Sequence, residues 1–204
     1  MRRKTVIITG YIGSGKSAVC ALLRERGIPV YDSDSRTKLL YDRVPGLLER
    51  LEAALGIGLR GADGRLDRKA LSARIFADEA ARRTLEGIVY PAVLQDFKRW
   101  RSRQKGAPFV VLESAVILSK PVFDGLASAV VLVTAPEEVR LQRVLQRDPL
   151  PETAVRARMA AQQIPLEKVT VTLSNDGTPE ALASAVHQVF FDKNSYLCKI
   201  LSEA

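Results

Sequence analysis

The N-terminal part of the chain combines two short apolar runs with a helical pattern between them. Residues 5–9 (Thr-Val-Ile-Ile-Thr) predict a buried strand, and a turn rich in glycine separates this strand from a helix over residues 16–26. Gly27 ends the helix, and residues 28–31 predict a second strand. Strand, helix and strand in this order form a βαβ unit, so we expect the pair of strands to be parallel.

Three further strands are predicted much later in the chain. Residues 109–112 and 130–133 are short apolar runs, and residues 168–173 alternate β-branched side chains before a turn at residues 174–177. Residues 154–163 and 178–191 have helical patterns. The pattern as a whole predicts an α/β fold with a parallel sheet of about five strands flanked by helices.

The stretch between the second and third predicted strands is helical throughout. Its apolar residues recur at steps compatible with three and four. They are Leu71, Ile75, Leu85, Ile88, Val89, Val93, Phe97 and Trp100. Pro91 would break a helix in its middle, so we expect a new helix to begin after Tyr90. The sequence therefore predicts a helical insertion in an α/β core.

The composition is that of an ordinary globular protein. Of the 204 residues, 47% are hydrophobic and 26% are charged, which excludes disordered and collagen-like classes. The apolar runs, such as residues 109–112 and 127–133, are far shorter than the roughly 20 residues of a spanning helix. Cys20 and Cys198 form no disulfide framework or metal-binding spacing, so we expect a cytoplasmic protein.

The net charge of +8 favours an anionic partner, which could be nucleic acid, a membrane surface or a phosphorylated small molecule. Residues 97–101 interleave aromatic and basic side chains, as some single-strand binders do. A helix with a basic, solvated face explains one such stretch better.

Residues 10–17 match the phosphate-loop pattern G-x-x-x-x-G-K-[ST] between a predicted strand and a predicted helix. Glycines let successive backbone N–H groups converge on phosphates, and the start of the helix adds its positive end. Lys16 would reach the β- and γ-phosphates, and the Ser17 hydroxyl would help to hold Mg²⁺. The alternative is a Gly/Ser turn that only caps a helix.

The phosphate loop alone does not select a reaction. The N-K-x-D element of a GTPase is missing from the sequence, and the strand over residues 110–112 ends in Glu113 where nucleotide motors usually have Asp. A small-molecule kinase fits better, because such enzymes pair this core with a helical substrate cap and a lid that carries arginines.

Two carboxylates, Asp32 and Asp34, follow the second predicted strand. In an open parallel sheet, that edge also carries the phosphate loop and the ligand crevice. One carboxylate could accept a proton from a substrate hydroxyl, and the other could position Mg²⁺ through water. The alternative is capping of the following helix.

A later helix, beginning at Glu137, carries Arg140, Arg143 and Arg147 on one face. Arginine side chains match phosphate geometry and can neutralise charge on a phosphoryl group in transfer. We interpret this helix as part of a lid. A solvated face balanced by neighbouring carboxylates is the alternative.

Together these features resemble the dephospho-coenzyme A kinase family over most of the chain. Residues 9–17 are similar to its T-G-G-I-G-S-G-K-[ST] loop, and residues 30–34 are similar to its D-A-D element. Residues 71–76 resemble its L-x-x-x-[IV]-F segment, and residues 143–148 resemble its R-x-x-x-R-D lid motif. Its Q, K and N-x-G positions are matched by Gln162, Lys168 and residues 175–177.

The resemblance implies ATP-dependent phosphorylation of the ribose 3′-hydroxyl of dephospho-coenzyme A, the last step of coenzyme A synthesis. It implies that the protein uses ATP and Mg²⁺ as cofactors and that neither nucleic acid nor a membrane is a partner. The expected P-loop kinase-like core comprises residues 1–36, 106–138 and 166–204. The expected helical substrate-binding insertion is residues 37–105, and the lid is residues 139–165.

The resemblance also implies roles for individual residues. Asp34, the second Asp of its element, is the expected base, and Arg143 and Arg147 would contact the transferred group. The expected nucleotide-binding residues are Gly13, Ser14, Gly15, Lys16, Ser17, Ala18, Arg140 and Asn175. Ser17 and Asp32 are the expected metal-binding residues.

The departures from the family pattern include Tyr11, Lys38, Tyr90, Glu113 in place of a common Asp, and residues 115–119, which end in Ser119. Tyr11 replaces a glycine and would crowd the loop if that position required a positive φ. Tyr90 replaces a histidine on the substrate side. Two other functions stay open, which are a kinase for another small molecule or nucleoside monophosphate and a nucleotide-binding regulator without catalysis.

Overall fold

A computed structural model describes residues 4–203, so residues 1–3 and 204 of the predicted core lie outside the described residues. The described residues form two compact units. One is Asp32–Trp100, and the other combines the residues up to Tyr31 with those from Arg101 onward.

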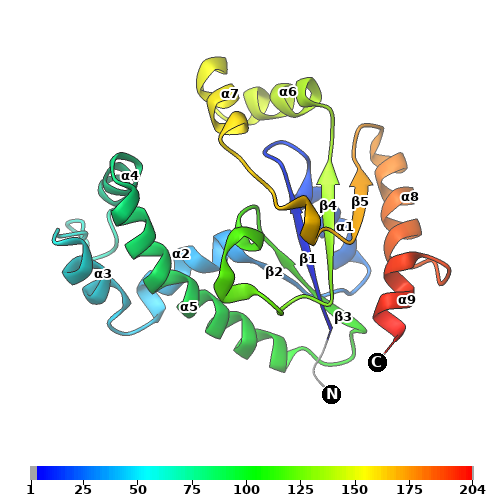
Figure 1. The fold of residues 1–204 in the computed structure, drawn as a ribbon, viewed down its shortest axis with the longest axis horizontal. Coiled ribbons are helices and arrows are strands. Elements are labelled where there is room, and N and C mark those ends of the chain that lie inside the picture. Colours follow the sequence, from blue (N-terminus) through cyan, green and yellow to red (C-terminus); the bar gives the residue numbers. More distant parts are fainter. Residues whose placement is uncertain (1–3, 204) are drawn as a thin grey trace. The chain divides into compact units, whose positions relative to one another are not determined.

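The second of these units is built on a five-stranded sheet in the order β2-β3-β1-β4-β5 (Figure 1). At its centre, β1 (Lys4–Gly10) pairs in parallel with β3 (Phe109–Glu113) and β4 (Ala129–Thr134). At one edge, β5 (Val171–Ser174) pairs in parallel with β4. The prediction of a parallel α/β sheet of five strands is confirmed.

The two strands of the N-terminal βαβ unit are not neighbours in this sheet. The strand β3 lies between β1 and β2 (Val30–Asp32), and the Val111 N–H donates to the Pro29 carbonyl over 2.9 Å. All residues of β3 are buried, and a strand that is apolar on both faces belongs inside a parallel sheet. Local order along the chain could not reveal this insertion.

One face of the sheet is covered by the helices α1 (Lys16–Glu25), α8 (Pro179–Phe190) and α9 (Tyr196–Ser202). The amphipathic pattern predicted α1 and α8, whereas α9 was not foreseen. The helices α6 (Glu137–Arg147) and α7 (Glu152–Ala160) share a smaller cluster, built on Leu141, Val144, Val155 and Met159.

The unit Asp32–Trp100 is helical, as expected. It contains α2 (Ser33–Arg43), α3 (Leu47–Leu55), α4 (Arg68–Ala77) and most of α5 (Glu79–Arg103). Leucines from α3, α4 and the segment between them form its core. The Arg36 guanidinium donates to Asp96 Oδ2 over 2.8 and 3.0 Å and thereby joins α2 to α5.

The prediction of a new helix after Tyr90 was wrong, because α5 continues through Pro91. On both sides of Pro91 the helix presents apolar residues, including Val89, Val93 and Phe97, that are buried. Tertiary packing of this face therefore outweighs the local cost of about 3 kcal/mol that a proline imposes inside a helix.

Two predicted boundaries near the C-terminal part of the sheet were also wrong. Lys168 lies in a short 3₁₀ helix, Leu166–Lys168, and not in β5. At this position its ammonium group donates to the Leu118 carbonyl over 2.9 Å and to Asp124 over 2.8 Å. The helix α7 ends at Ala160, so Gln162 lies beyond it. Two further 3₁₀ turns, Ile117–Ser119 and Pro121–Phe123, connect β3 to β4.

Among residues 4–203, no helix is both long and apolar enough to cross a membrane.

Replacing Pro91 by alanine should stabilise the protein by about 1–2 kcal/mol. Alanine restores an N–H inside the helix, which outweighs the greater freedom of the unfolded chain. Urea unfolding followed by circular dichroism measures the change. The Lys98→Ala variant, at another exposed position of α5, should change stability by less than about 0.5 kcal/mol. A loss of stability in Pro91→Ala would mean that the packing of α5 requires the proline.

Candidate phosphate-binding site

The loop between β1 and α1 needs glycine at two positions. Gly13 and Gly15 have φ values of +79° and +87°, a region that other residues rarely adopt. A Cβ on Gly13 would collide with the carbonyl oxygen of Arg140, and one on Gly15 would collide with the side-chain nitrogen of Asn175. The glycines of the motif thus permit both the turn and the close approach of two other segments.

Side chains bind four carbonyl groups of this loop, of which the Tyr11 carbonyl accepts from Lys16 over 3.5 Å. Lys16 Nζ donates to the Gly10 carbonyl over 2.9 Å, and Asn175 Nδ2 donates to the Ser14 carbonyl over 2.8 Å. The Ile12 carbonyl accepts from Arg140 over 3.4 Å. These contacts hold the carbonyls, and the positive end of the helix dipole at the start of α1 favours the binding of an anion there.

The Ser17 hydroxyl donates to Glu113 Oε1 over 2.8 Å. Ser17 is the second residue of α1 and Glu113 ends β3, so the sheet brings residues far apart in sequence to one point. Hydroxyl and carboxylate oxygens are the ligands that Mg²⁺ prefers, and the pair fits such an ion beside a bound phosphate. The described residues hold no group of three or more acidic, His or Cys side chains that could bind a metal by themselves.

The arginines of α6 divide into two sets. Arg140 contacts the loop at Ile12 and also donates to the Ala135 carbonyl over 3.1 Å, and Arg143 donates to the Asn175 carbonyl over 3.0 Å. Arg147 instead forms two 2.9 Å hydrogen bonds with Asp148, which raise the pKa of Arg147 and lower that of Asp148. The structure brings Arg140 and Arg143 to the loop and its neighbour Asn175.

Tyr11 does not distort the loop. Within residues 4–203, positive φ values occur only at glycines, so the position does not require the glycine that is usual there. The Arg140 guanidinium lies over the Tyr11 ring, 5.0 Å from its centroid. The expected crowding is absent, and the ring provides a cation–π contact for Arg140.

Asp32 and Asp34 belong to the unit Asp32–Trp100. Asp32 caps α2, accepting from the Ser35 N–H at 3.0 Å and from the Ser35 hydroxyl at 2.6 Å. Capping, the alternative considered from the sequence, is thus observed for Asp32. Asp34 lies exposed in the first turn of the same helix.

A model of the dephospho-CoA kinase family matches residues 4–180 of this sequence. The chain belongs to this family. The dephospho-CoA kinase of Anaeromyxobacter dehalogenans is 36% identical over 195 residues, covering 93% of this chain and 92% of its own. That of Porphyromonas gingivalis is 40% identical over 159 residues, covering 78% of this chain and 77% of its own. The crystal structure of TT1252 from Thermus thermophilus is 36% identical, with a TM-score of 0.77 over 91% of this chain and 95% of its own.

Tyr90, a departure from the dephospho-CoA kinase pattern, lies within electrostatic reach of Asp34. Burial raises the pKa of Tyr90 most strongly, and the negative charges of Glu86 and Asp34 raise it further, against a smaller opposite effect of Arg82. The phenol therefore stays neutral at physiological pH. Unlike the histidine usual there, it does not change charge near pH 6.5.

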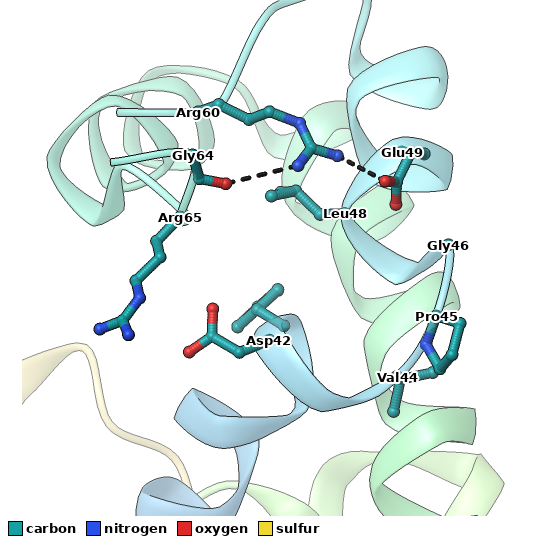
Figure 2. A pocket seen from close by; sticks show the side chains of 10 residues that line it. Asp42, Val44, Pro45, Gly46, Leu48, Glu49, Arg60, Gly64 and Arg65 are labelled. Carbon is teal, nitrogen blue, oxygen red and sulfur yellow. Dashed lines mark hydrogen bonds and ion pairs between the residues drawn. The ribbon is translucent and has the colours of Figure 1, made fainter. Parts of the chain in front are cut away.

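The same unit contains a cavity of about 310 Å³ between α2, α3 and the turn around Gly64 (Figure 2). Arg60 crosses its upper side in Figure 2, donating to Glu49 over 2.6 Å and to the Gly64 carbonyl over 3.4 Å. Asp42 and Arg65 line the same cavity. The cavity is thus lined by side chains of both positive and negative charge, and the positive charge of Arg60 is already balanced by its carboxylate partners.

Two residues at the site had only weak signals in the sequence. Glu113 was noted as an acidic strand end, and its bond to Ser17 adds it to the candidate metal site. Gln162 matched a family position without an assigned role, and its side chain contacts the phosphate loop. Lys38 and Ser119 are far from that loop in sequence. The Lys38 carbonyl accepts from Arg68, and the Ser119 hydroxyl donates to the Val116 carbonyl.

Replacing Gly15 by alanine should destabilise the protein by more than about 2 kcal/mol, with about 1–2 kcal/mol from the left-handed backbone and the rest from the collision with Asn175. Affinity for ADP should fall at least tenfold. Thermal unfolding and calorimetric titration measure both effects.

Gly27→Ala is the matched control, because Gly27 has a φ of +77° but a Cβ at this position would meet no neighbouring atom within 4 Å. This variant should lose only the backbone contribution and keep its affinity for ADP. Equal effects of the two variants would show that the contact with Asn175 is unimportant.

Proposed function

We propose that this chain transfers the γ-phosphoryl group of ATP to the 3′-hydroxyl of dephospho-CoA. The main support is the phosphate loop, with Ser17 bonded to Glu113, in a member of the dephospho-CoA kinase family. The net charge of +8 suits two polyanionic substrates without requiring nucleic acid or a membrane.

ATP would bind with its phosphates at the N-terminus of α1. The proposed contacts come from the loop amides, Lys16 and side chains that follow β4 and β5. The residues are Gly13, Ser14, Gly15, Lys16, Ser17, Ala18, Arg140 and Asn175. Lys16 would exchange the Gly10 carbonyl for the more negative phosphate oxygens.

Mg²⁺ would be held by the Ser17 hydroxyl, with Glu113 as an outer partner and Asp32 acting through water. Such an ion neutralises charge on the phosphates during transfer. Asp32 would retain its contacts with Ser35, since an outer role through water leaves its oxygen atoms available for both.

Asp34 is the proposed base. Asp32 caps α2, and Asp34 is exposed in the first turn of the same helix, two residues after the end of β2. Its carboxylate would accept the proton of the 3′-hydroxyl as that oxygen attacks the γ-phosphorus. Tyr90 would support this role as a neutral group near Asp34.

Arg143 and Arg147 would neutralise the transferred phosphoryl group. Arg143 already lies at Asn175, beside the loop, whereas Arg147 would exchange Asp148 for the more highly charged phosphate. We propose residues 139–165 as the lid that carries them.

The remaining boundaries follow from the same proposal. Residues 37–105 would bind dephospho-CoA, and residues 1–36, 106–138 and 166–204 would form the nucleotide-binding core. Cys20 and Cys198, both among the described residues, form no disulfide, in accord with the proposed cytoplasmic location.

Release of ADP from MgATP tests the reaction. Turnover should depend on dephospho-CoA and be at least a hundredfold slower with AMP or without an acceptor. Phosphorylation of another acceptor at a higher rate would reassign the substrate, and nucleotide binding without any acceptor-dependent turnover would favour a regulatory protein.

Asp34→Asn should lower kcat by about 10²–10⁴-fold, the usual contribution of a positioned acid or base, and leave the affinity for ADP within twofold. Glu25→Gln, an exposed carboxyl-to-amide change at the end of α1, is the control and should leave both values unchanged. Normal turnover of Asp34→Asn would remove Asp34 from the role of base.

A further inference from the structure

Gln162 holds the main chain of the phosphate loop at two points. Its Oε1 accepts from the Ile12 N–H over 2.7 Å, and its Nε2 donates to the Gly10 carbonyl over 3.3 Å. The residue lies two positions after the end of α7 and is half-buried. A single side-chain amide thus provides a donor and an acceptor to peptide groups at the start of the loop.

The lid segment holds Ile12 in two further ways. Arg140 of α6 donates to the Ile12 carbonyl over 3.4 Å, so both polar groups of this residue are bound by side chains of the lid. The Ile12 side chain packs against the cluster that contains Leu141 and Val144. The position of the lid and the shape of the loop are therefore mechanically connected at Ile12.

The Gly10 carbonyl is shared between two donors. Lys16 Nζ lies 2.9 Å from its oxygen and Gln162 Nε2 lies 3.3 Å from it. If Lys16 turns to a phosphate, the carbonyl keeps Gln162 as a partner, which avoids the cost of an unsatisfied buried acceptor. The amide thereby allows Lys16 to leave without disturbing the end of β1.

We propose that Gln162 is a positioning residue for the nucleotide. It fixes the Gly10–Ile12 main chain so that the following amides face the phosphates, and it replaces Lys16 at the Gly10 carbonyl when Lys16 binds ATP. This inference rests on the proposed binding of ATP phosphates by the loop and adds a residue that touches neither phosphate nor acceptor.

If Gln162 only stabilised the fold, its replacement would lower the affinity for MgADP only together with the melting temperature. The cluster of α6 and α7 is apolar and does not depend on the amide of Gln162, so an apolar side chain of similar length should leave the fold intact. Methionine has that length and can neither accept strongly from the Ile12 N–H nor donate to the Gly10 carbonyl.

Gln162→Met should weaken the binding of MgADP and raise KM for ATP by about tenfold, since two hydrogen bonds to the loop are lost. KM for dephospho-CoA and the melting temperature without nucleotide should stay at the values of the unchanged protein. Gln163→Met, the same substitution at the adjacent exposed glutamine, is the control and should change none of these quantities.

Gln162→Glu adds a pH-dependent readout. The protonated carboxyl group can accept from the Ile12 N–H and donate to the Gly10 carbonyl, whereas the carboxylate repels that carbonyl and the phosphates. Relative to the unchanged protein at the same pH, affinity for MgADP should be near normal at about pH 5 and fall at least tenfold by about pH 8. The phosphates and the Gly10 carbonyl would raise the pKa of this carboxyl group, against the opposite effect of Lys16 and Arg140, the cations that bind the Gly10 and Ile12 carbonyls.

Unchanged affinity for MgADP in both Gln162 variants would overturn the proposal, as would a loss that only accompanies a lower melting temperature. MgADP binding needs no acceptor, so the two proposals can fail separately. If the Gln162 variants bind MgADP more weakly as expected but the protein phosphorylates no acceptor, this inference stands and the proposed function is refuted. The pH readout of Gln162→Glu decides the question if the methionine variant does not fold.

Discussion

The site depends on one constraint in the phosphate loop. When the loop directs its amides toward phosphates, its carbonyl groups point elsewhere, and each of these carbonyls needs a hydrogen-bond donor. Here the donors are side chains from distant segments. Gly10 is bound by Lys16 and Gln162, Ile12 by Arg140, and Ser14 by Asn175. A phosphate loop of this shape is therefore stable only when the segments after β4 and β5 are in place.

The strand register supplies that arrangement. Gly10 lies opposite Val133 of β4, which lies opposite Leu173 of β5, so the loop and the segments that follow both strands begin at the same level. The Asn175 N–H donates to the Thr134 carbonyl over 2.8 Å and extends the pairing beyond β5 by one bond. Parallel pairing thus determines where Asn175 and the start of α6 meet the loop.

Local patterns predicted the elements well and their neighbours less well. The loop, its flanking strand and helix and the arginine face of α6 follow from motif and periodicity within a short window. The insertion of β3 beside β1 and the continuity of α5 through Pro91 follow from tertiary packing, which no local window contains. The bonds from Ser17 to Glu113 and from Ile12 to Gln162 join residues 96 and 150 positions apart, so only the folded sheet reveals them.

The departure at Tyr11 shows how such a site accepts change. The family glycine suggested a requirement for positive φ, but the two positions with that requirement are Gly13 and Gly15. At a position without it, a larger side chain costs nothing in backbone strain and restricts the unfolded chain. Its ring then lies under Arg140, whose guanidinium also binds the Ile12 carbonyl. The substitution therefore changes how the arginine is held while the loop keeps its shape.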